Sequence, residues 1–178
     1  DAIVLGASTV SGTYAVTATS GGDITNTGVL AITNGATFTV ADGRSITLNQ
    51  SNTFSSTVTF VASSSGTIAG VTINDSNAFD LKALTTTGNL TVTAGGAVTD
   101  SGALVIPGTT TITATGQVVD LDHTSNNFAT ILFGSSSNAV SSVEVVDTNA
   151  IVIGASKSTG NFTVTAGDDV TDSGTVTV

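Results

Sequence analysis

Three acidic side chains make the best candidate for a metal site in this sequence. Asp120 and Asp122 are two residues apart, so on an extended strand they lie on one face. Glu144 follows Asp120 by 24 positions, which is one repeat of the chain as derived below. Carboxylates stacked on neighbouring strands repel each other unless a cation lies between them, and oxygen-only ligands suit Ca²⁺. The pattern therefore predicts either a calcium site at Asp120, Asp122 and Glu144 or an ordinary hydrated acidic surface.

His123 is the single imidazole of the chain and stands in the stretch Asp120-Leu-Asp-His-Thr-Ser125. A catalytic triad needs a His that is held by a carboxylate and faces a nucleophile in a pocket. His123 falls in the turn after a predicted strand, so we expect a solvated turn residue. We predict no catalytic and no cofactor-binding residues.

An enzyme that acts on polysaccharides, a lyase or a glycosidase, is the alternative that the acidic residues leave open. A lyase of this kind needs a Lys or Arg base beside clustered carboxylates. Arg44, Lys82 and Lys157 are the three basic residues, and we expect none of them beside an acidic group in register. The predicted turns are also too short to build a cleft, so we expect no enzyme activity.

Composition excludes several classes of partner. Lys and Arg number 3 against 13 Asp and Glu, a net charge of −10, which argues against nucleic acid and anionic membranes. No apolar run approaches the length of a membrane span. Cys is absent, and the chain starts at Asp1 without a single Met, so we expect a processed chain or an excerpt of a longer one.

The predicted secondary structure is all β. Stretches such as 89–94 and 110–114 alternate Thr with apolar residues, which puts one face inward and one outward. Gly, Ser, Asn and Asp interrupt these stretches every few residues, as turns require. We expect Leu90, Val92 and Ile112 to point into a core and the neighbouring Thr residues to point out.

Internal repeats organise the chain at two levels. The string GNLTVTAG at 88–95 returns as GNFTVTAG at 160–167, 72 positions later. This period divides the chain into long repeats 1–76, 77–148 and a partial 149–178. Within them, a Gly or Asn recurs at a nearly constant spacing, at Gly28, Asn52, Asn77, Gly102, Asn126, Asn149 and Gly174.

The shorter period predicts a solenoid. Gly and Asn both tolerate the left-handed backbone conformation, so we interpret the seven positions as a ladder of corners with positive φ. Three short strands between corners make one coil of about 24 residues, and about seven coils stack at roughly 4.8 Å each. The predicted fold is a single uncapped parallel β-solenoid, which we expect to occur in a longer chain or a stack of copies rather than as a free monomer.

Parts of the sequence resemble the repeats of giant bacterial surface proteins of the filamentous haemagglutinin type. The strings that carry the resemblance are GNLTVTAGGAVTDSG, ANAIVIGAS and ITLNQSNTF. The resemblance implies a right-handed β-helix fibre, secreted and displayed on the cell surface for adhesion, aggregation or a filamentous coat. The expected partners are copies of itself, further repeats of a longer chain and surface glycans.

The Thr-x-Thr pairs raise one further interpretation, a flat Thr surface of the kind that binds ice. Such a surface has to run unbroken along one side of the solenoid. The third predicted strand of each coil loses its Thr pair at 66–70 and 139–142. We therefore expect the outward Thr residues to serve as β-formers and not as an ice-binding array.

Overall fold

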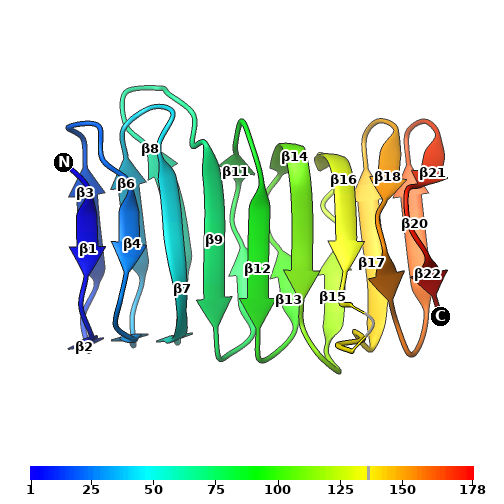
Figure 1. The fold of residues 1–178 in the computed structure, drawn as a ribbon, viewed down its shortest axis with the longest axis horizontal. Coiled ribbons are helices and arrows are strands. Elements are labelled where there is room, and N and C mark those ends of the chain that lie inside the picture. Colours follow the sequence, from blue (N-terminus) through cyan, green and yellow to red (C-terminus); the bar gives the residue numbers. More distant parts are fainter. Residues whose placement is uncertain (136) are drawn as a thin grey trace.

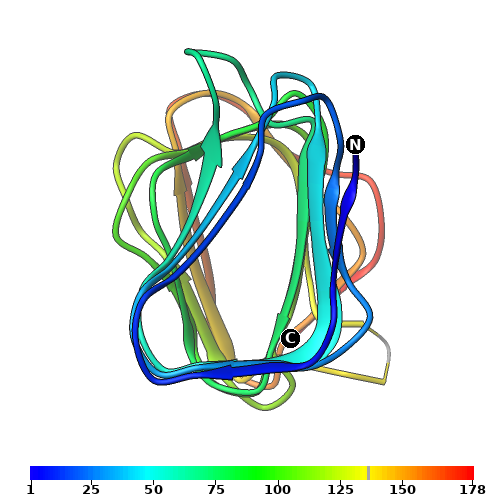
Figure 2. The ribbon, with the colours of Figure 1, turned by 90° about the vertical axis from the view of Figure 1, so that its left-hand side faces the viewer.

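The computed structural model describes residues 1–135 and 137–178, and strands coil around one axis through all of them. Figure 1 shows the coils side by side along the long axis, with the two termini at opposite ends. Seen along that axis, the coils overlie one another as a closed ring (Figure 2). Every strand pairing is parallel, as it must be when equivalent strands of successive coils meet. The described residues contain no helix long and apolar enough to cross a membrane.

One side of the solenoid is a continuous main sheet. Nine strands follow one another along it: β1 (Ile3–Leu5), β4 (Ile24–Asn26), β7 (Ser45–Phe54), β9 (Gly70–Asp75), β12 (Leu90–Ala94), β14 (Leu104–Thr113), β16 (Asn127–Phe133), β18 (Ile151–Ile153) and β21 (Val170–Asp172). Three short strands branch from this path: β2 (Ser8–Val10), β5 (Leu30–Ile32) and β11 (Leu84–Thr85).

Smaller sheets form the other sides. The first contains β3 (Tyr14–Ala18), β6 (Ala36–Val40) and β8 (Val58–Ala62). The second contains β10 (Phe79–Leu81), β13 (Val98–Asp100), β15 (Val118–Leu121), β17 (Ser142–Asp147) and β20 (Phe162–Ala166). A two-stranded sheet pairs β19 (Ser156–Lys157) with β22 (Val176–Thr177).

The parallel β-solenoid predicted from the sequence is confirmed, with shorter and more numerous coils. About eight turns follow one another at a spacing of about 21 residues. The spacing is uneven, because Ile46 pairs with Val71 and Val71 in turn pairs with Leu90, so the first of these two coils is clearly the longer. The predicted coil of about 24 residues is therefore longer than the average coil of the structure. Individual coils differ in length because the loops that join their three sides differ in length.

The core is a column of apolar side chains inside the ring. Strand residues alternate between buried and outward positions, so Leu90, Val92 and Ile112 are fully buried, as expected. Phe38 packs between Tyr14 and Phe60 of the neighbouring coils, with ring centroids 6.1 Å apart on both sides. Stacking of like residues on successive coils thus fills the interior without long side chains.

The smaller sheets are interrupted in one place, which we call the seam. In the described part of the chain, β8 is the last strand of its sheet and β10 is the first strand of the next, with no pairing between them. The main sheet continues past this point through the pairing of β7 with β9. The loop after β8 holds Ser64 and Ser65 at positive φ and projects from the ring (Figure 2).

Candidate functional site

The predicted calcium ligands are only partly brought together. Asp120 and Glu144 lie side by side on β15 and β17, as expected, and line a shallow groove of about 150 Å³. Burial, with a smaller contribution from Asp122, raises the pKa of Asp120, whose Oδ1 is buried without a partner. Among the described residues, however, no group of three His, Cys, Asp or Glu side chains could hold a metal ion. The structure thus brings Asp120 and Glu144 together, and the calcium site stays a prediction.

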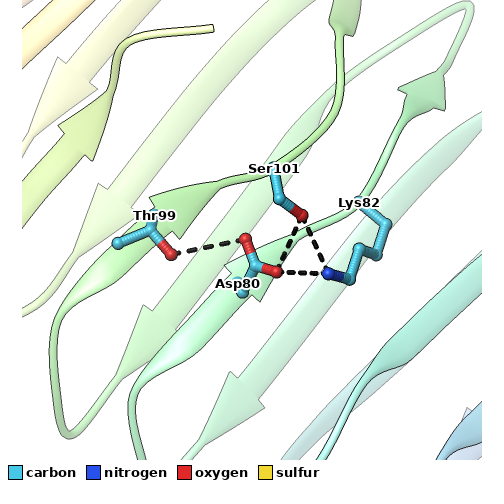
Figure 3. A network of polar contacts seen from close by, with 4 residues as sticks. All are labelled: Asp80, Lys82, Thr99 and Ser101. Carbon is cyan, nitrogen blue, oxygen red and sulfur yellow. Dashed lines mark hydrogen bonds and ion pairs between the residues drawn. The ribbon is translucent and has the colours of Figure 1, made fainter.

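A small polar network lies on β10 and β13 (Figure 3). The Lys82 ammonium is 2.5 Å from Asp80 Oδ2 and donates to Ser101 Oγ at 2.8 Å. Ser101 Oγ donates to Asp80 Oδ2 at 2.8 Å, and Thr99 Oγ1 donates to Asp80 Oδ1 at 3.3 Å. The Lys82–Asp80 pair forms along one coil, because residues two apart on a strand share a face, whereas across the coils Lys82 meets Ser101 and no described acidic group.

His123 lies in the turn between β15 and β16, as expected. Its Nδ1 accepts a hydrogen bond from the Ser125 backbone N–H at 3.2 Å, and its own backbone N–H donates to Asp100 Oδ1 at 3.4 Å. These contacts fix the turn. They do not aim the imidazole at a nucleophile.

The interpretation of the Gly and Asn positions as one corner ladder with positive φ is wrong. In the described chain, positive φ occurs only at Ser64 and Ser65 and at four glycines: Gly21, Gly43, Gly116 and Gly134. The seven predicted positions also lie at different corners, since Asn77 precedes β10 whereas Gly102 precedes β14. The full set concerned is Gly28, Asn52, Asn77, Gly102, Asn126, Asn149 and Gly174.

The glycines of that set are needed for close packing between coils. A Cβ on Gly28 would lie 2.1 Å from the backbone nitrogen of Ala7, and one on Gly102 would lie 2.4 Å from that of Ala83. Backbone atoms of a paired coil cannot move away. These corners therefore exclude any side chain, whatever the value of φ.

Two Asn residues of the set are buried inside the ring and form hydrogen bonds between coils. Asn52 is fully buried, and its Oδ1 accepts hydrogen bonds from Asn26 Nδ2 at 2.8 Å and from the Leu30 N–H at 2.9 Å. Its Nδ2 donates to the carbonyls of Leu48 and Asn74, both at 3.1 Å. One amide thus uses all four of its hydrogen bonds to join three successive coils.

The same arrangement recurs further along the rod. Asn126, also fully buried, accepts from the Leu104 N–H at 2.9 Å and donates to Asp100 Oδ2 at 2.7 Å. Side chains meet along the axis at Asn26/Asn52 and Asp100/Asn126. Successive members of the predicted corner ladder do not meet, because coil length and sequence period differ.

Two buried carboxylates take the place of Asn in this inner ladder. Asp75 Oδ1 accepts from the Phe54 N–H at 3.1 Å and the Asn77 N–H at 3.3 Å. Asp147 accepts from the Phe128 N–H at 2.6 Å and the Asn149 N–H at 2.8 Å. Burial raises the pKa of both side chains despite these bonds. The ladder satisfies backbone N–H groups where corners interrupt strand pairing, and we interpret it as structural.

The outer surface of the main sheet carries a rank of Thr residues whose register the sequence analysis did not predict. Thr25, Thr47, Thr72, Thr91 and Thr111 are in register on five successive strands, one per coil. The expected break at 66–70 lies elsewhere, because β9 begins at Gly70 and supplies Thr72. The sequence pattern that marks these strands is an apolar-Thr-apolar triplet, which recurs at irregular spacing at 46–48, 71–73 and 90–92.

A groove of about 450 Å³ opens at the seam, between residues 54–58 and 77–80. It is lined by Ser55, Ser56 and Thr57 on one coil and by Asn77 and Asp80 on the next. Phe54 and Phe79 lie beneath it but are buried. The groove thus offers polar groups without an exposed ring or a pair of facing carboxylates.

Three stretches of the chain match one family model, described as repeats of unknown function (DUF5649): residues 1–61, 69–133 and 139–178. The first unmatched stretch, 62–68, contains the projecting loop at the seam. No curated protein and no solved structure matches the chain significantly.

Proposed function

We propose that this chain, which belongs to the family described as repeats of unknown function (DUF5649), is a structural and adhesive segment of a bacterial surface fibre. The family match and the solenoid make it a repeat protein. The surface location, the adhesive role and the filament are the proposal.

The observation that carries the proposal is the continuous main sheet. Its nine strands run from β1 to β21, so hydrogen bonds parallel to the axis join one end of the rod to the other. Each added coil lengthens the rod by roughly 4.8 Å and leaves its three-sided cross-section unchanged. A chain built in this way gains reach in proportion to its repeats, which is the property that a fibre needs.

The outer strands support assembly along the axis. β1 and β21 each pair on one edge only within the described chain, and an open strand edge can pair with another strand. Further repeats of the same polypeptide or a second copy are the partners that fit. The Ser-, Thr- and Asn-rich exterior is suited to hydrogen bonding with surface glycans.

The alternative, an enzyme acting on polysaccharides, has no specific support in the described residues. Asp120 and Glu144 lie side by side on neighbouring coils of one outward sheet face, and Lys82 is engaged by Asp80. A general base and a general acid would instead have to face each other across a bound sugar.

The test is to localise the chain in the bacterium that makes it. Antibodies raised against the 178-residue chain should label intact cells and extended fibres in electron microscopy, and an isolated fibre should diffract with a meridional spacing of about 4.8 Å. Labelling only after lysis would overturn the surface location. Release of sugar fragments from a polysaccharide, lost on changing one acidic residue, would overturn the structural role in favour of the enzyme.

A further inference from the structure

Five consecutive strands of the structure return 72 residues later. The strands β9 to β13 lie within residues 68–102, and the strands β17 to β21 lie within residues 140–174. Each strand of the second set has the bounds of its counterpart in the first set, moved by 72 positions. We call the two segments the first unit and the second unit. They share a local structure and not only a string of residues.

Contacts within the two units recur with the same spacing. Thr86 Oγ1 donates to the Gly88 carbonyl at 2.8 Å, and Ser158 Oγ donates to the Gly160 carbonyl at 3.0 Å. Both hydroxyls belong to buried side chains. The isolated strand bridges match as well, namely Ile68–Thr86 and Val140–Ser158. The two units are therefore equivalent pieces of solenoid.

The spacing of 72 residues is more than three coils and fewer than four. Strand pairing leads from Phe79 through Val98 and Val119 to Val143, a path of three coils that takes up 64 positions. One further coil leads to Phe162 and brings the path to 83 positions. The second unit therefore begins part of a coil further round the axis than the first unit.

Equivalent strands of the two units accordingly lie in different sheets. β9 and β12 belong to the main sheet, whereas their counterparts β17 and β20 belong to the five-stranded sheet. The reverse holds for β10 and β13 of the five-stranded sheet, whose counterparts β18 and β21 belong to the main sheet. Figure 1 shows β9 and β12 in front and the fainter β17 and β20 behind. The second unit is thus turned about the axis relative to the first.

From this offset we infer that successive 72-residue units of a longer chain turn about the rod axis, so that equivalent side chains follow a helical path around it. Thr91 on the main sheet and Thr163 on the five-stranded sheet are one such pair. Each unit advances the path by between three and four coils, or roughly 14 to 19 Å. The inference rests on the proposed function only where it extends to a longer chain, since the turn between the two units belongs to the 178-residue chain itself.

The turn decides which kind of partner can bind every unit. A flat surface, such as a lattice or the side of a second rod, cannot contact equivalent groups of successive units at once, because these groups face different directions. A compact partner no larger than one unit can bind each of them from its own side. The turn also interrupts the rows of identical side chains through which β-sheets stack face to face into aggregates. The rod is therefore suited to separate contacts around its circumference, and not to one continuous contact along a side.

The test measures distances between pairs of spin labels on the 178-residue chain, which has no Cys of its own. Thr91→Cys with Thr163→Cys labels two equivalent positions. Thr99→Cys with Thr163→Cys is the matched control on one sheet, because pairing leads from Thr99 through Asp120 and Glu144 to Thr163 in three coils. All three Thr side chains point outward, so both variants should fold, and circular dichroism checks this.

We expect electron paramagnetic resonance to give the shorter distance for Thr99/Thr163, whose backbone positions are roughly 14 Å apart. The Thr91/Thr163 distance should be clearly longer, because it includes the width of the rod. A third variant, Thr99→Cys with Thr171→Cys, repeats the 72-residue separation from the other sheet and should also give the longer distance. Equal distances, or shorter distances for the two equivalent pairs, would place the units directly above one another and overturn the inference. Absence of the chain from the cell surface would overturn the proposed function and leave these distances unchanged.

Discussion

Replacement of Asn52 by Ala should strongly destabilise the solenoid. The side chain is fully buried and makes four hydrogen bonds, so its removal leaves the Leu30 N–H and the carbonyls of Leu48 and Asn74 without this partner. Asn26 keeps its bond to the Gly28 carbonyl at 3.0 Å and loses less.

The magnitude follows from the number of groups left unpaired. Each buried polar group without a partner costs at least about 1 kcal/mol, so three of them lower the free energy of unfolding by about 3 kcal/mol or more. For a denaturant dependence of about 2 kcal/mol per molar urea, the unfolding midpoint should fall by about 1.5 M or more. Circular dichroism during a urea titration measures this shift.

Asn149→Ala is the matched control. Asn149 occupies the same phase of the sequence repeat as Asn52 but is exposed, so its loss should change stability by less than about 0.5 kcal/mol. Asn52→Asp should also destabilise the solenoid strongly, because it puts an acceptor oxygen against the carbonyls of Leu48 and Asn74 in a fully buried place. Equal midpoints for Asn52→Ala and Asn149→Ala would refute the inner ladder and restore the single corner ladder.

Three more substitutions test other parts of the structure. Gly102→Ala should lower the melting temperature, because the new Cβ would lie 2.4 Å from a backbone atom of the neighbouring coil. Gly12→Ala is the control and should not lower it, because a Cβ there has nothing within 4 Å. Equal melting temperatures for the two variants would contradict the close approach at Gly102. Since burial raises the pKa of Asp75 above 3.8, the folded state binds its proton more tightly, and this residue's contribution to stability is full below pH 3.8 and declines as pH rises through the raised value. Asp75→Asn should make stability fall less steeply with pH, and an unchanged slope would argue against the shift. Glu144→Gln removes a like charge opposite Asp120 and should raise the melting temperature slightly without added Ca²⁺; a stabilisation by Ca²⁺ that only the parent shows would instead revive the metal site.

The side on which each strand residue lies could be predicted from the sequence, because a period of two leaves little choice. Thr91 and Thr93 had to point out once Leu90 and Val92 pointed in. The register between coils could not be predicted in the same way. It depends on loop lengths that vary from coil to coil, and the long sequence repeat averages over them.

The candidate sites depended on that register and were predicted less well. Asp120 and Glu144 meet because the length of their own coil happens to match the predicted period. Asn52 and Asn77 do not, since Asn52 pairs with Asp75. Gly and Asn looked equivalent because both tolerate positive φ, whereas here Gly is needed for its missing side chain and Asn for its amide. The predicted long repeats 1–76, 77–148 and 149–178 stay a prediction.

The seam between β8 and β10 has a mechanical consequence. A rod pulled along its axis carries the load through the hydrogen bonds between coils, and at most levels the strands of more than one side share it. At the seam, strand pairing within the described chain is limited to that of β7 with β9 and the bridge between Ile68 and Thr86. Tension should therefore open the rod first at this level, on the side of the groove, while the main sheet still holds. A filament with such a joint yields by bending locally before any coil unravels.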